Sequence, residues 1–124
     1  MDTGKRKEDY QFYNGYEGEK ELILSLPDLS VHIWDGYIDD IFGNPIPSND
    51  GWSGFTRDYN EFVGPYEDDC IEVAILPDEY IEDAVRYKER EYEFEETKDV
   101  LDRILSLLKT AKDADICLLV SVKG

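Results

Sequence analysis

The 124-residue sequence has few of the residue types on which catalytic and metal sites depend. It has one histidine, His32, and two cysteines, Cys70 and Cys117, without the paired spacing of a zinc site. Neither common glycine-rich phosphate-binding pattern occurs, and no serine or cysteine stands in a recognisable nucleophile motif. We interpret His32 as a half-exposed strand residue rather than a general base. We therefore expect no cofactor, no metal ion and no catalytic residue, and a protein that is not an enzyme.

Long apolar runs are absent as well. No stretch of about 18 apolar residues occurs, so a membrane-spanning helix is not predicted. The basic residues near the N-terminus are not followed by the apolar segment of a secretory signal peptide. We therefore expect a cytoplasmic protein that has no membrane partner. In that compartment its two cysteines are expected to be reduced and buried.

Basic residues are scarce in the middle of the chain. Residues 21–85 contain sixteen acidic residues and a single basic residue, Arg57, whereas the flanking segments are nearly balanced. Almost the whole formal net charge of −17 therefore arises in this block. A charge that served only solubility would be spread more evenly, and concentrated charge destabilises a compact domain by self-repulsion. This pattern favours a cationic partner and opposes direct binding of nucleic acid.

Two Trp, nine Tyr and five Phe are too many for a disordered acidic tail, and the length suits one domain over residues 1–124. The polar residues 1–8 are expected to be flexible. Glycine and proline between residues 43 and 51 predict a loop. Apolar alternation and β-branched runs predict strands, including a short one over 55–63. The other predicted strands cover residues 9–13, 21–26, 29–34, 70–76 and 116–122.

Helical spacing appears twice in the C-terminal half. Pro77 followed by acidic residues is typical of a helix start and predicts a short helix. From Thr97, the expected N-cap, apolar residues recur at helical spacing and predict a long amphipathic helix over about 97–112. We therefore predict an α+β fold. It consists of a mostly antiparallel sheet whose front strands form a meander, with the long helix packed on one face and a final apolar strand in the interior of the sheet.

Acidic and aromatic residues alternate between Trp34 and Asp69. Tyrosine and tryptophan are frequent anchors of protein interfaces, and fixed carboxylates around them steer a basic partner to the surface. We therefore predict a partner-binding surface in this block, with the acids supplying charge-assisted hydrogen bonds to Lys and Arg. The predicted partner-binding residues are Asp39, Asp40, Asp50, Trp52, Asp58, Glu61, Tyr66, Glu67, Asp68 and Asp69.

From about residue 50 onward the chain resembles immunity proteins of bacterial polymorphic-toxin and contact-dependent growth inhibition systems. The matching features are residues 51–55, Phe62 with Gly64-Pro65, and an acidic cluster before an apolar strand. They continue with residues 78–83, Tyr87-Lys88, residues 94–97, a leucine-rich helix and a final strand. The resemblance implies a small cytosolic protein that binds a cognate toxin domain, often a basic nuclease, and blocks it. It carries over no contact residue.

Two other functions use the same acidic residues. Carboxylates spaced like phosphates could imitate nucleic acid and inhibit DNA- or RNA-binding proteins, but such mimicry predicts regular rows of acids. In this sequence the acids cluster near turns, as in Asp39-Asp40 and Glu67-Asp68-Asp69, which better suits the filling of a cleft. A small ligand-binding domain or a carboxylate-based enzyme is a further alternative, and it requires a concave pocket.

Overall fold

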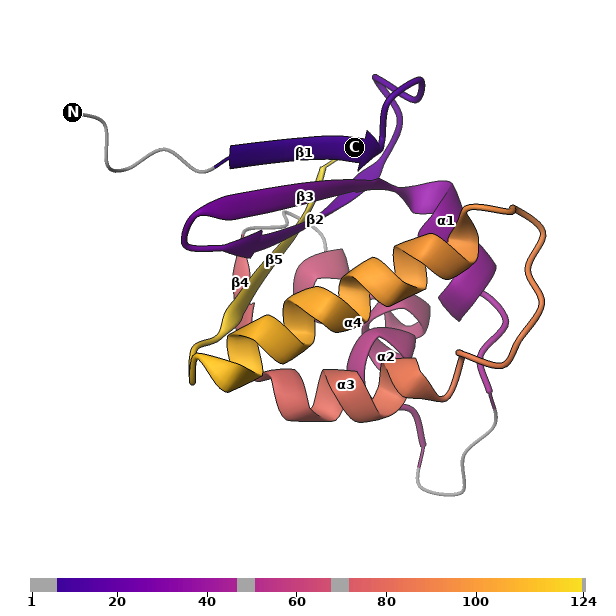
Figure 1. The fold of residues 1–124 in the computed structure, drawn as a ribbon. Coiled ribbons are helices and arrows are strands. Elements are labelled where there is room, and N and C mark those ends of the chain that lie inside the picture. The colour runs from indigo at the N-terminus through magenta and orange to yellow at the C-terminus, as the bar shows by residue number, and fades with distance from the viewer. Residues whose placement is uncertain (1–6, 47–50, 68–71, 124) are drawn as a thin grey trace.

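The computed structural model describes residues 7–46, 51–67 and 72–123 (Figure 1). This part of the chain forms an α+β fold with a mixed sheet and helices. In chain order the elements are β1 (Lys7–Phe12), β2 (Glu21–Leu26), β3 (Leu29–Trp34), α1 (Asp35–Phe42), α2 (Gly54–Glu61), the 3-10 helix η1 (Gly64–Tyr66), β4 (Val73–Ile75), α3 (Pro77–Val85), α4 (Thr97–Asp113) and β5 (Leu118–Lys123).

The sheet has the strand order β1-β3-β2-β5-β4. β2 runs antiparallel to both β3 and β5, and β4 runs antiparallel to β5, whereas β1 pairs with β3 in parallel. The predicted α+β class and the mostly antiparallel sheet are confirmed. The simple meander is wrong, because the turn-rich residues 13–20 carry the chain past β3 before β2 begins (Figure 1).

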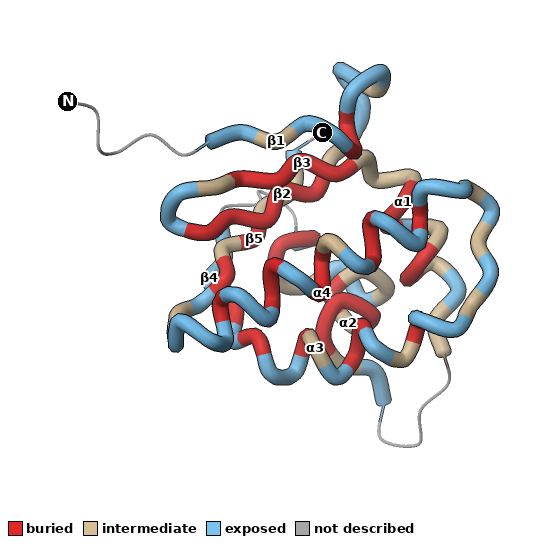
Figure 2. Tube along the Cα trace, viewed as in Figure 1, coloured by how far each residue is buried: buried red, intermediate tan, exposed pale blue. Residues whose placement is uncertain are grey.

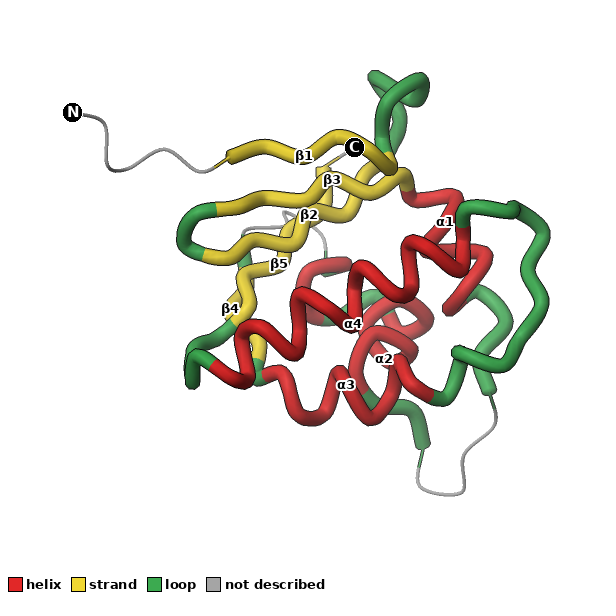
Figure 3. Tube along the Cα trace, in the orientation of Figure 1, coloured by secondary structure: helices red, strands yellow, loops and turns green. Residues whose placement is uncertain are grey.

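All the helices lie on one side of the sheet, with α4 crossing it (Figures 1 and 3). Alternate residues of the central strands point towards this layer, as the period of two in a strand requires. In α4 the apolar residues recur at helical spacing and are buried, and they belong to the same core as the buried residues of the central strands (Figure 2). The centre of this core contains Leu22, Leu24, Val31, Ile33, Val100, Ile104, Leu108, Leu118 and Val120.

The predicted strands over 21–26 and 29–34 match β2 and β3, and the long helix and the interior final strand are also present. Thr97 begins α4 but is not its cap, since Glu96 holds the N-cap position. The short strand predicted over 55–63 is wrong, because most of this segment is the helix α2. Lys7 and Glu8 belong to β1 rather than to a flexible tail, because β1 is hydrogen-bonded along β3 from its first residue.

Helix α1 follows β3 immediately and was not predicted. Its apolar residues Tyr37, Ile38, Ile41 and Phe42 are all buried, on one face. Their spacing of one, three and one residues is helical, but the glycines at both ends of the segment obscured it in the sequence. This helix carries Asp39 and Asp40, two of the predicted partner-binding acids.

Candidate partner-binding surface

Helix α2 is fixed to α3 through its first turn. Asp83 of α3 accepts a hydrogen bond from the backbone N–H of Thr56 at 2.9 Å and another from its hydroxyl at 2.8 Å. This carboxylate therefore caps the N-terminal end of α2 from a different helix. Gly54 has φ +57°, and a Cβ there would lie 2.7 Å from the Cβ of Asp83. Only glycine allows the two helices to approach this closely.

A second buried carboxylate, Asp58, continues the link between the two helices. It is 1% exposed, accepts a hydrogen bond from the Tyr80 hydroxyl at 2.6 Å and forms an ion pair with Arg57 at 3.0 Å. Burial raises the pKa of Asp58 and that of Asp83. Their hydrogen-bond donors and the neighbouring arginines offset only part of this rise. Arg57 also pairs with Glu79 at 3.3 Å. The one basic residue of the block 21–85 is thus already neutralised within the protein.

Asp40 holds α1 to the start of α4. Its carboxylate accepts hydrogen bonds from the backbone N–H groups of Glu93 and Phe94, each at 3.1 Å. The hydroxyl of Thr97 donates a third hydrogen bond at 2.6 Å. Three groups of the protein itself thus donate hydrogen bonds to this half-buried carboxylate. It is not free to bind a partner, and we leave it out of the partner-binding surface.

The C-terminal end of α2 is different, because it presents a large aromatic ring to solvent. Phe62 ends the helix with φ 55° and ψ 46°, the left-handed conformation. Its side chain is 69% exposed. A bulky residue seldom adopts this backbone conformation, which costs about 1–2 kcal/mol relative to an ordinary one. Packing of this ring against the core therefore does little to offset the strain at Phe62.

Exposed acids lie near Phe62 in the chain. Glu61 precedes Phe62, and the Tyr59 hydroxyl donates a hydrogen bond to Asp39 of α1 at 2.7 Å. The ring of Tyr59 also meets that of Tyr66 edge-on, with 5.2 Å between centroids, and the exposed Glu67 follows Tyr66 in the chain. We call the residues Asp39, Tyr59, Glu61, Phe62 and Glu67 the α2 surface.

Two carboxylates of α1, Asp35 and Asp39, act on the tyrosine of the α2 surface. Burial, followed by its hydrogen bond to Asp39, raises the pKa of Tyr59. At the start of α1, burial raises the pKa of Asp35, Lys20 lowers it, and Asp39 raises it further. Lys20 is engaged nearby, with its ammonium nitrogen 5.6 Å from the centroid of the Tyr66 ring. A cationic side chain of a partner would therefore meet the exposed carboxylate of Asp39 close to the partly buried carboxylate of Asp35.

The predicted site residues fall into three groups. Asp39, Glu61 and Glu67 are exposed and lie on the α2 surface, and Trp52, 36% exposed, precedes the opposite end of α2. Asp58 and Tyr66 are buried and Asp40 is occupied, so these three do not present a free carboxylate or ring to a partner. Three further predicted residues lie outside the described part of the chain: Asp50, Asp68 and Asp69.

Phe62 is the residue that the prediction missed. It was named among the residues that carry the resemblance, but its exposure depends on where α2 ends. The Gly64-Pro65 pair that follows it is a signal for the end of a helix. That signal was usable only if α2 had been recognised as a helix.

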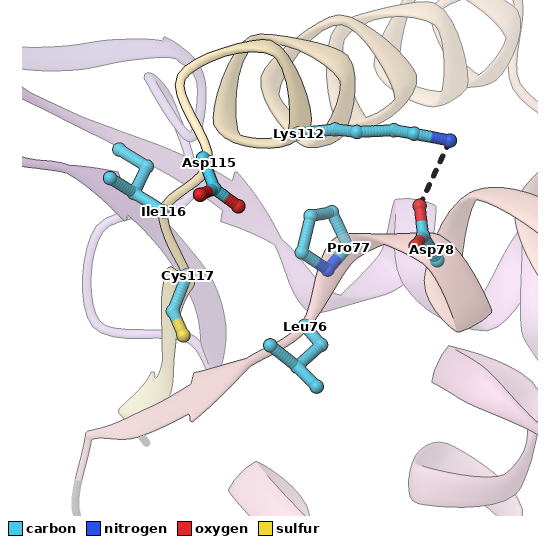
Figure 4. A pocket seen from close by; sticks show the side chains of 7 residues that line it. All are labelled: Leu76, Pro77, Asp78, Lys112, Asp115, Ile116 and Cys117. Atoms are coloured by element: carbon cyan, nitrogen blue, oxygen red, sulfur yellow. Dashed lines mark ion pairs between the residues drawn. The ribbon is translucent and has the colours of Figure 1, made fainter.

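A separate hollow of about 190 Å³ lies near the junction of β4 and α3 (Figure 4). It is lined by Leu76, Ile116 and Cys117, with the ion pair between Asp78 and Lys112 at its rim. Cys117 has a free thiol but is exposed, so its predicted burial is wrong, because it precedes β5 rather than lying within it. Cys70 is outside the described residues. In residues 7–46, 51–67 and 72–123, no group of three His, Cys, Asp or Glu side chains is placed to hold a metal ion.

None of the helices in the described segments has the length and apolar character needed to cross a membrane. No family model, curated protein or solved structure matches the chain. Its function therefore has to be argued from the surfaces described above.

Proposed function

We propose that the protein binds a basic protein domain through the α2 surface and neutralises it, as an immunity protein neutralises its toxin. The observation that carries this proposal is Phe62, a large exposed ring held in a strained backbone conformation directly after the exposed Glu61. Strain of this kind is concentrated at functional sites, because the free protein does not benefit from it. A partner that covers the ring would provide the missing gain.

The ring of Phe62 is suited to be the apolar anchor of such an interface. Full burial of a phenylalanine side chain contributes about 1.5–3 kcal/mol, and a few anchors of this kind dominate most interfaces. The backbone of Phe62 is fixed between the last turn of α2 and η1. The ring is therefore presented without a large loss of backbone entropy on binding.

The acids of the α2 surface are suited to select a basic partner. Asp39 is oriented by the Tyr59 hydroxyl, and Glu61 and Glu67 extend into solvent on either side of Phe62 in the sequence. Exposed carboxylates of this kind accelerate the association of a basic protein and disfavour acidic ones. Arginine and lysine side chains of the partner would complete the charge-assisted hydrogen bonds.

An aromatic anchor bordered by acids favours a single cognate partner over mimicry of nucleic acid. A mimic depends on negative charge alone and needs no exposed ring at the centre of its surface. Loss of the ring therefore distinguishes the two functions. It should abolish high affinity for a cognate toxin domain but leave the affinity of a polyanion mimic for basic proteins unchanged.

The test begins with affinity capture from the source cell's own lysate, followed by purification of the captured polypeptide and kinetic measurements with it. We expect one basic polypeptide that remains bound at high salt. The double variant Glu61→Gln/Glu67→Gln should slow association and reduce its salt dependence. The matched control is Asp99→Asn/Asp102→Asn, which removes two exposed charges from α4. Equal association rates for the two double variants would contradict the proposal, as would release of many nucleic-acid-binding proteins together at moderate salt.

A further inference from the structure

The chain's one histidine lies between two carboxylates on the face of the sheet away from the helices. Its neighbours Val31 and Ile33 point into the core, so His32 points to the opposite face. Its Nδ1 contacts a carboxylate oxygen of Glu21, and its Nε2 lies 2.6 Å from a carboxylate oxygen of Glu8. The histidine is 7% exposed, and the three residues come from three adjacent strands.

These contacts fix the number of protons that the three groups must share. A carboxylate only accepts hydrogen bonds, and a neutral imidazole has one N–H and one lone pair. With both Glu8 and Glu21 ionised, a neutral His32 would therefore set its lone pair against a carboxylate oxygen. Both contacts are favourable only if the cluster holds two protons, either on a charged imidazole or with one on a carboxyl group.

The surroundings of the cluster favour keeping the second proton. From β1, the ring of Tyr10 stacks on His32 with 4.2 Å between centroids, a geometry that suits a cationic ring. Burial, followed by the negative charge of Glu21, raises the pKa of Tyr13, whose hydroxyl donates a hydrogen bond to the backbone carbonyl of Glu19 and adds no charge to the cluster. Lys123 of β5 is in register with Glu21, and a cation at that position opposes the second proton. In the described segments, no lysine or arginine forms an ion pair with Glu8 or Glu21.

We propose that Glu8, His32 and Glu21 form a proton-dependent clasp that holds the edge strand β1 against β3. When the second proton leaves at higher pH, one histidine contact becomes repulsive, and the exposed Glu8 is the partner that can move. β1 then retains its ladder with β3 and the ion pair between Asp9 and Arg103 at 3.0 Å. Because both histidine contacts are favourable only while the second proton is held, the clasp contributes less to the pairing of β1 after that proton leaves.

Two measurements on the full chain between about pH 5 and 9 test the clasp. The first is amide hydrogen exchange of residues 8–12, expressed as protection factors. The second is the ring nitrogen NMR signal of His32, which is unambiguous because the chain has one histidine. We expect β1 protection to fall about fivefold as the second proton leaves, at the pH where the ring signal changes.

The variant Glu8→Gln separates the proton from the contact. A glutamine amide can donate to or accept from a neutral imidazole, so this variant should keep β1 protected without any pH dependence over the range. Glu8→Ala should lower β1 protection at every pH, and Glu89→Gln, at an exposed site outside the sheet, should behave as wild type. The same pH dependence of β1 protection in wild type and Glu8→Gln would overturn the proposal. So would β1 protection in wild type that does not change with pH.

Discussion

Variants with glycine or alanine at position 62 test what causes the strain at the end of α2 and what the Phe62 ring does. Both substitutions remove the ring, but only glycine adopts the left-handed conformation without steric cost. Relief of that conformation is worth about 1–2 kcal/mol, against roughly 0.5–1 kcal/mol for the greater entropy of glycine in the unfolded chain. Phe62→Gly should therefore be more stable than Phe62→Ala by about 0.5–1 kcal/mol. This is the reverse of the usual order inside a helix.

The comparison with wild type follows from the exposure of the ring. Because Phe62 is 69% exposed, about a third of its burial energy, roughly 0.5–1 kcal/mol, is lost with the ring. Phe62→Gly should thus have nearly wild-type stability, while Phe62→Ala should unfold at a temperature several degrees lower, on the order of 4 °C. Both variants should weaken partner binding by about 1–2 kcal/mol, because both lose the two thirds of the ring's burial energy that only the partner can supply.

Urea unfolding measures the stabilities, and titration calorimetry with the purified partner measures the affinities. Asp115 provides the matched control, because it also has a positive φ, 57°, at the end of α4. Asp115→Gly should be more stable than Asp115→Ala, and both should bind as wild type does. An alanine variant at position 62 that is at least as stable as the glycine variant would refute the strain argument. Wild-type affinity in both position-62 variants would refute the role of the ring.

The remaining predictions concern the buried carboxylates and the close approach between α2 and α3. Gly54→Ala should cost about 2–4 kcal/mol in urea unfolding, from strain and from the clash with Asp83, whereas Gly51→Ala, also at positive φ but with open space, should cost about 1 kcal/mol. Burial raises the pKa values of Asp58 and Asp83, so the folded state binds protons before the unfolded chain does. The urea midpoint should therefore rise as pH falls from 7 towards about 4, and Asp83→Asn should reduce this slope. A midpoint that falls steadily over the same range would contradict the assignment.

The strands β2 and β3 and the helix α4 could be predicted because their signals are local. Pro27-Asp28 joins the two strands in a turn, and the apolar residues of α4 repeat at one spacing for four turns. The pairing of β1 could not be predicted, because the choice between β2 and β3 as a neighbour depends on where residues 13–20 lead the chain. No sequence pattern distinguishes those two routes.

Helix α2 was missed for a similar reason. Its first turn is capped by Asp83, which is 27 positions from Thr56 in the sequence. A short segment with few apolar residues has little helix signal of its own, and here the tertiary contact decides the conformation. The error moved Phe62 from the end of a helix to the inside of a strand, and its exposure went unrecognised.

Composition locates the acidic block in the chain but does not show which of its acids are exposed after folding. Charge counting located the part of the chain that contains Asp39, Glu61 and Glu67. It could not tell these exposed acids from Asp40 and Asp58, which accept hydrogen bonds from the chain itself. That distinction depends on donors such as Thr97 and Tyr80, which are distant in sequence and close only after folding.

The most direct test of the proposed function is amide hydrogen exchange of the protein, free and in complex with its captured basic partner. We predict that binding protects residues 59–67 most strongly, because they surround Phe62 at the end of α2. Protection confined to the outer face of the sheet or to the edge strand β4, with residues 59–67 exchanging as in the free protein, would contradict the proposal.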